Sequence, residues 1–105
     1  MRRLVLLAWL APCLAWGAPD GQQIVLHGNA NGAMPCAACH GVDSGGKPAI
    51  GAPALAGLPA GQITAALAGM AKGEGGNAMM QSIAHSLSPA EIQAVAIYFA
   101  GLRQP

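Results

Sequence analysis

The stretch Met34-Pro-Cys-Ala-Ala-Cys-His-Gly41, in one-letter code MPCAACHG, decides the fold of this chain. It places Cys36 and Cys39 three residues apart and follows them directly with His40. Such a cluster can serve as a redox disulfide, as half of a zinc site or as an attachment point for haem. The rest of the sequence has to distinguish these three chemistries.

Residues 1–17 have the features of a secretory signal peptide. Two arginines precede an apolar run over residues 4–14, which is too short to cross a bilayer comfortably. Small residues follow at the positions that a signal peptidase reads, so we expect cleavage after Gly17 and a mature domain of residues 18–105. An uncleaved anchor and a lipoprotein modified at Cys13 are the alternatives.

The mature domain is nearly uncharged and keeps only two cysteines, both in the quoted stretch. Its three basic side chains stand against four acidic ones, which leaves a net charge of −1 with histidine neutral. A basic patch, the usual mark of a nucleic-acid-binding protein, is missing. We therefore expect no nucleic-acid partner and no strong long-range electrostatic steering.

The cysteine cluster fits zinc and thiol chemistry poorly. A structural zinc site needs four nitrogen or sulfur ligands, and beyond the two cysteines only His27, His40 and His85 are present. A thiol–disulfide site normally lies in a βαβ setting, which this sequence does not predict, and it leaves His40 without a role. A disulfide closing so small a loop also stabilises little.

The haem interpretation uses every residue of the cluster. Cys-x-x-Cys-His is the attachment signature of c-type haem. On one turn of helix, positions i and i+3 bring both sulfurs to one side, where they can form two thioethers, and His40 can offer its Nε2 to the iron. The large aromatics of the mature domain are only Tyr98 and Phe99, so a covalent haem c would also supply missing interior. We predict one such cofactor.

Two helices are predicted on either side of the cluster and of a glycine- and proline-rich stretch, residues 41–57. Residues 20–26 form a short helix, with Asp20 as N-cap and Gly28 after its end. Residues 59–70 form a second helix, whose apolar face consists of Ile63, Ala66, Leu67 and Met70.

The clearest helix is the last. Ser88 is its N-cap, Pro89 occupies the first helical position, and Glu91 completes a capping box. An apolar stripe follows, made of Ile92, Val95, Ala96, Phe99 and Leu102. A shorter helical turn is predicted for residues 79–86. No segment shows the alternation of apolar and polar residues that is typical of a strand. The predicted class is all-α, with three main helices and short turns.

The iron needs a sixth ligand unless its other face is open. The candidates are two histidines and four methionines: His27, His85, Met34, Met70, Met79 and Met80. Both histidines are expected on the surface. Met70 belongs to an apolar face, where methionine normally packs, and Met34 lies too close to Cys36 to reach the other side. Met79 and Met80 follow a glycine-rich loop and can reach that side, and spacing alone leaves the two open.

With these motifs in order, the chain resembles a class I cytochrome c, of the short exported bacterial kind with one haem. The resemblance covers residues 21–102. It rests on Gly21-x-x-Ile-Val, Cys36-x-x-Cys-His-Gly, Pro53-x-Leu-x-Gly, Asn77-x-x-Met and a final helix with Ala96-Ile-Tyr. It implies the small class I fold wrapped around one covalently bound haem.

The resemblance also implies roles for single residues. Met80, three residues after Asn77, matches the family's distal ligand, with Met79 as the alternative. Pro53 matches the proline whose backbone carbonyl binds the ligand histidine, here His40. Gly21 matches the small residue at which the first and last helices cross, with a tyrosine packing over it.

The predicted function is that of a periplasmic electron carrier, not an enzyme, with iron that cycles between ferrous and ferric states. Its partners would be redox proteins, including a dehydrogenase or a terminal oxidase, met transiently through an apolar rim of small residues. Two alternatives stay open: a haem subunit of a dehydrogenase complex, and a haem protein with an open site for gas binding or catalysis.

Overall fold

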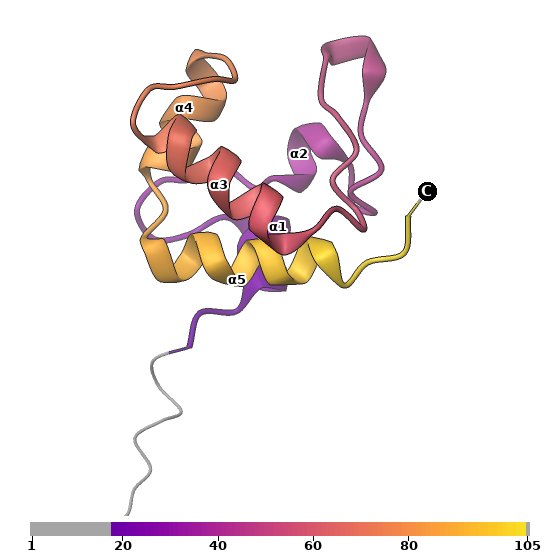
Figure 1. Cartoon of the computed structure of the whole chain (residues 1–105), viewed down its shortest axis with the longest axis horizontal. Coiled ribbons are helices and arrows are strands. Elements are labelled where there is room, and N and C mark those ends of the chain that lie inside the picture. The colour runs from indigo at the N-terminus through magenta and orange to yellow at the C-terminus, as the bar shows by residue number, and fades with distance from the viewer. Residues whose placement is uncertain (1–17, 105) are drawn as a thin grey trace, which may run out of the picture.

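The computed structural model describes residues 18–104, and this part of the chain is helical (Figure 1). In order, the elements are α1 (Gly21–His27), α2 (Ala37–His40), the 3₁₀ helix η2 (Pro48–Ile50), α3 (Ala60–Ala71), α4 (Ala78–His85) and α5 (Pro89–Ala100). Within residues 18–104 the only β-type pairing is an isolated bridge between Lys47 and Ala52. The all-α prediction is therefore confirmed, while the predicted signal peptide lies outside the described residues.

The predicted caps start the first and last helices. The side chain of Asp20 accepts a hydrogen bond from the amide of Gln23 at 3.2 Å, which begins α1. At α5 the Ser88 hydroxyl accepts from the Glu91 amide at 3.1 Å, and the Glu91 carboxylate accepts from the Ser88 amide at 2.9 Å. Both caps satisfy amides that have no partner within the helix.

The core lies where α1 crosses α5. A side-chain carbon at Gly21 would collide with the backbone carbonyl of Ala94 and would lie 3.1 Å from Cβ of Tyr98. Only glycine allows so close an approach, which confirms the predicted role of Gly21. The stripe of α5 faces this core, with Val95 and Ala96 fully buried.

The helices α3 and α4 pack against each other, and α3 also packs on α5. On α3, Ile63 and Leu67 are buried as predicted, whereas Met70 is half-buried and Ala66 is exposed. All four residues line a cavity, which is described below. The predicted turn near 79–86 is the complete helix α4, which begins one residue earlier.

The stretch predicted as irregular, residues 41–57, leaves the helices as a long loop (Figure 1). Its two arms meet at the Lys47–Ala52 bridge, and η2 forms the tip between them. The sequence prediction missed η2, because Pro48 at its first position was read only as a loop residue. The loop returns to the core at Gly57, whose amide donates to the Phe99 carbonyl at 2.8 Å.

Candidate haem site

A cavity of about 800 Å³ opens between α2, the long loop, α3 and α4. This volume falls in the upper part of the range for cofactor sites. Its polar lining residues are few: Cys36, Cys39, His40, Gln62 and Asn77. The remainder of the wall is aliphatic, glycine, proline or methionine, with Phe99 at the bottom from α5. Such a cavity suits a large apolar group that is held by a few well-placed polar atoms.

The two cysteines of the quoted stretch stand at the start of α2. Cys36 is its N-cap residue with helical backbone angles, and Cys39 lies within the helix. Both are half-buried, both line the cavity, and no disulfide joins them. Burial raises the pKa of the Cys36 thiol, partly offset by a hydrogen bond with backbone. The helical spacing thus presents two sulfurs to one cavity wall, as expected.

His40 ends α2 and is almost fully buried, with 6% of its surface exposed. Its Nδ1 lies 2.8 Å from the backbone carbonyl oxygen of Pro53. A carbonyl can only accept a hydrogen bond, so Nδ1 carries the proton and donates it. The unprotonated nitrogen is then Nε2, the tautomer in which a histidine can bind a metal through Nε2. The structure therefore brings His40 and Pro53 together as the resemblance implied.

The methionine wall comes from α4 and α3. Asn77 caps α4, since its side chain accepts a hydrogen bond from the Met80 amide at 2.8 Å. Met80 is half-buried, whereas Met79 is 53% exposed, and both line the cavity. Met70 reaches the same wall from α3, beside Gly76. The difference in burial favours Met80 over Met79 as the inward-facing side chain.

The remaining sixth-ligand candidates lie elsewhere or at the rim. His27 and His85 are exposed and do not line the cavity, and His85 Nδ1 lies 3.3 Å from the Ala71 carbonyl. Met34 does line the cavity, but on the side of Cys36 and with 44% of its surface exposed. Among residues 18–104, His40 is therefore the only histidine of the cavity wall.

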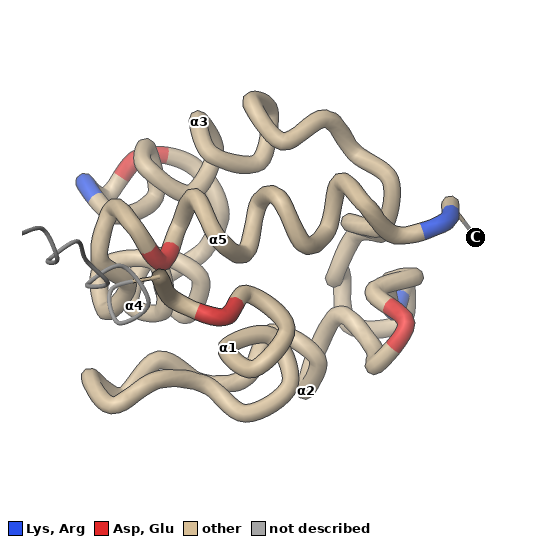
Figure 2. The backbone as a smooth tube through the Cα atoms, turned by 90° about the horizontal axis from the view of Figure 1, so that it is seen from below, with Lys and Arg blue, Asp and Glu red and all other residues tan. Residues whose placement is uncertain are grey.

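Among the residues that the structure describes, no charged side chain lines this cavity. Figure 2 shows the charged residues of the described part of the chain at helix ends and in loops, and the whole of α3 is free of them. An uncharged, apolar wall keeps the local dielectric constant low, so the imidazole, thiol and thioether groups dominate the chemistry of the site. This donor set and the shape of the cavity fit a haem attached through two thioethers.

Sequence reasoning missed two features of the site. Asn77 was recognised only as part of a motif, although an asparagine directly before a helix is a standard N-cap signal. The second is Ser44, which has a left-handed backbone with φ of 59° and a fully buried hydroxyl without a hydrogen-bond partner. Nothing in the sequence marks a serine for that conformation.

The comparisons with known proteins agree with this geometry. The family model "Cytochrome c" matches residues 20–103, so the chain belongs to the cytochrome c family. Its members bind haem c covalently, and the cysteines and histidine of that attachment line the cavity of this chain. No helix within residues 18–104 has the length and apolar character that a membrane span requires.

Two relatives share a printed name, thiosulfate dehydrogenase electron acceptor. The protein from Stutzerimonas stutzeri (strain A1501) is 44% identical over 89 residues, which cover 84% of this chain and 41% of the relative. The protein from Thiomonas intermedia (strain K12) is 38% identical over 103 residues, 98% of this chain and 45% of the relative. The chain thus spans less than half the length of either relative.

Solved structures show the same fold. Thiosulfate dehydrogenase (TsdBA) from Marichromatium purpuratum, in its as-isolated form, superposes with a TM-score of 0.76 at 33% identity over 80% of this chain and 18% of that chain. Reduced cytochrome c4 from Pseudomonas stutzeri gives 0.74 at 28% identity, covering 79% and 46% of the two chains. Cytochrome c4 from Acidithiobacillus ferrooxidans gives 0.74 at 29%, covering 82% and 53%.

Proposed function

We propose that the chain accepts single electrons from a thiosulfate-oxidising dehydrogenase, and that His40 and Met80 would bind the iron of its haem. In this proposal Cys36 and Cys39 form the two thioethers and Pro53 orients His40. The observation that carries it is the position of these residues on the walls of one apolar cavity, with His40 Nδ1 2.8 Å from the Pro53 carbonyl.

When bound, the haem supplies a one-electron couple between ferrous and ferric iron. The residues of the chain tune and protect that couple. The Met80 thioether is a soft ligand, which favours the ferrous state and raises the reduction potential relative to a second imidazole. The Pro53 carbonyl holds the His40 ring in one orientation and one tautomer. The aliphatic walls exclude water and competing ligands.

The proposed donor rests on the two relatives, both named as electron acceptors of thiosulfate dehydrogenase. The solved structure of a thiosulfate dehydrogenase also supports this donor. The segment that matches our chain makes up 18% of that longer chain. A domain of this fold therefore occurs in the same polypeptide as a dehydrogenase. We therefore propose that this chain is an electron carrier that receives its electrons from such an enzyme.

The proposal includes export to the periplasm, with residues 1–17 as a cleaved signal peptide and residues 18–105 as the haem domain. The basic start and short apolar run of residues 1–17 support it. Mass spectrometry of protein isolated from the periplasm tests it. The expected N-terminus is Ala18, and a chain that keeps its first residues would contradict cleavage.

The ligand assignment is tested by visible spectroscopy of the ferrous protein with and without carbon monoxide. We expect a low-spin spectrum that the gas does not change, because Met80 occupies the sixth position. Met80→Ala should bind carbon monoxide, and Met79→Ala is the matched control that should not. The reverse result would assign Met79, and gas binding by the unaltered protein would favour an open site.

The donor is tested by mixing the oxidised protein with a purified thiosulfate dehydrogenase and thiosulfate. Rapid reduction of the haem, absent when either enzyme or thiosulfate is omitted, is the expected result. A spectrum of low-spin haem c that the enzyme fails to reduce would reject this donor while leaving the carrier function intact.

A further inference from the structure

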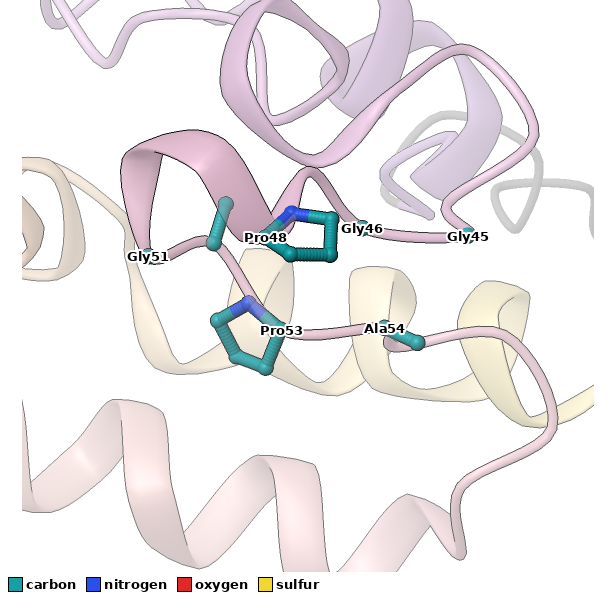
Figure 3. Close-up of a pocket in the computed structure, with 7 residues that line it drawn as sticks. Gly45, Gly46, Pro48, Gly51, Pro53 and Ala54 are labelled. Carbon is teal, nitrogen blue, oxygen red and sulfur yellow. The ribbon is translucent and has the colours of Figure 1, made fainter.

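The long loop, residues 41–57, brings two backbone segments close together at Gly46. A side-chain carbon built on Gly46 would lie 2.7 Å from the Ala54 amide nitrogen and 2.9 Å from both the Ala52 carbonyl oxygen and the Pro53 carbonyl carbon. Side-chain carbons do not approach backbone atoms so closely. Figure 3 shows Gly46 on one arm of the loop with Pro53 and Ala54 on the other.

Gly46 also contacts His40 through a hydrogen bond. Its amide donates to the His40 backbone carbonyl at 2.8 Å. His40 is thus held twice by this loop, at its backbone by Gly46 and at its ring by the Pro53 carbonyl, 2.8 Å from Nδ1. A side-chain carbon at Gly46 would therefore press on the carbonyl of Pro53, and this one position affects both attachments of His40.

The segment that carries Pro53 has little freedom to move away. On one side the Lys47 amide donates to the Ala52 carbonyl at 2.8 Å, and the Ala52 amide donates to the Lys47 carbonyl at 3.2 Å. On the other side the Ser44 carbonyl accepts from the amides of residues 55 and 56, at 2.9 and 3.0 Å. A side chain at position 46 must therefore push on a segment that is tied at both ends.

We propose that Gly46 is a positioning residue for His40: its missing side chain sets the place of the Pro53 carbonyl and thereby the reduction potential. The inference rests on the proposed function, in which His40 binds the iron. A strong hydrogen bond from Nδ1 makes the imidazole a better electron donor and stabilises ferric iron. Displacing the carbonyl weakens this bond, so the potential should rise.

The test compares Gly46→Ala with Gly32→Ala in the haem-loaded protein. Both glycines lie in loops with positive φ, 87° and 93°, so alanine strains the backbone at either position. No described residue lies within 4 Å of a side-chain carbon at Gly32, and Gly32 does not line the cavity. We expect Gly46→Ala to shift the ferric–ferrous equilibrium by about tenfold toward ferrous, which is about 59 mV for one electron. Gly32→Ala should leave the potential unchanged.

Equal potentials in the two variants, both with attached haem, would overturn the inference. Its failure is distinct from failure of the proposed function. If His40 and Met80 did not bind the iron, the unaltered protein would react with carbon monoxide or contain no covalent haem, whatever the potentials of the glycine variants.

A measurement on the unaltered protein covers the case in which Gly46→Ala does not assemble. Nuclear magnetic resonance with ¹⁵N-labelled protein reports hydrogen exchange at the Gly46 amide and at Nδ1 of His40. If the loop acts as one unit, the two protons have the same protection factor, which is the ratio of the intrinsic to the observed exchange rate, because one opening event exposes both. A protection factor of the Gly46 amide more than tenfold below that of Nδ1 would reject the inference.

Discussion

The two walls of the cavity are held in different ways. Cys36, Cys39 and His40 form one wall and come from a single short helix, α2, and its N-cap. Backbone hydrogen bonds of the long loop hold this wall in place. The wall with Met80 depends on side chains: Asn77 caps α4, and Gln81 donates to the carbonyls of Gly73 and Gly75 at 3.2 and 2.9 Å. We call these walls the attachment side and the ligand side after their proposed roles: backbone hydrogen bonds hold the first in place, and single polar side chains hold the second.

The largest effect should come from the attachment side. Changing both Cys36 and Cys39 to alanine removes both thioether positions, so we expect complete loss of covalently bound haem. Haem staining after denaturing electrophoresis measures this. Each single variant should keep a covalent bond through the remaining sulfur. Haem that still migrates with the double variant would contradict the attachment role.

The next effect concerns the cap of the ligand side. Asn77→Ala removes the hydrogen bond to the Met80 amide, and loss of such a cap costs about 1 kcal/mol of unfolding free energy. Because the freed helix end carries Met80, we also expect the ferrous variant to bind carbon monoxide, which the unaltered protein should not bind. Denaturant unfolding and stopped-flow mixing measure the two effects.

Ser88→Ala is the control for that variant. It removes the N-cap of α5, and Ser88 does not line the cavity. The loss of unfolding free energy should be similar to that of Asn77→Ala. Like the unaltered protein, this variant should not bind carbon monoxide. Carbon monoxide binding by both variants would show that general loss of stability, not the Met80 wall, controls access.

A smaller effect is expected in the long loop, where Ser44 lies. Ser44 adopts a left-handed backbone, which is unfavourable for any residue with a side chain, and its buried hydroxyl has no partner. Ser44→Gly relieves this strain, although the greater freedom of glycine in the unfolded chain offsets part of the gain. We expect about 0.5 kcal/mol of net stabilisation, or roughly 3 °C in Tm. A fall in Tm would mean that the hydroxyl has a bound partner.

The smallest effect is expected from salt. Exposed apolar side chains stand at the cavity mouth on both walls: Met34, Ile50 and Met79 are 44%, 61% and 53% exposed. With no charged residue in the lining, the rate of electron transfer to a partner protein should change less than about twofold between low and physiological ionic strength. Stopped-flow kinetics at several salt concentrations test this. A steep fall would locate the docking surface on charged residues elsewhere.

Much of this architecture could be predicted because its signals are local. Asp20, Ser88 and Glu91 cap helices through neighbours three residues away, and the cysteine spacing alone places two sulfurs on one side. The role of Pro53 came only with the family resemblance, because the hydrogen bond to His40 joins residues 13 positions apart.

The remaining features arise from tertiary contacts. Gly46 looks like any loop glycine until the second arm of the loop packs against it. Met79 and Met80 have the same chemistry, and their different burial follows from how α4 sits on α3. The left-handed Ser44 is the clearest case, because its backbone contradicts its own propensity and is imposed by the hydrogen bonds of the loop.

The crossing of α1 and α5 at Gly21 has a consequence for assembly of the domain. The two helices complete each other's core, so that core can close only when residues 21–100 are all available to fold together. Until α5 packs on α1, we expect the domain to stay open and Cys36 and Cys39 to stay accessible to an attachment enzyme. The order of the helices along the chain would thus leave a time window for cofactor maturation before burial ends it.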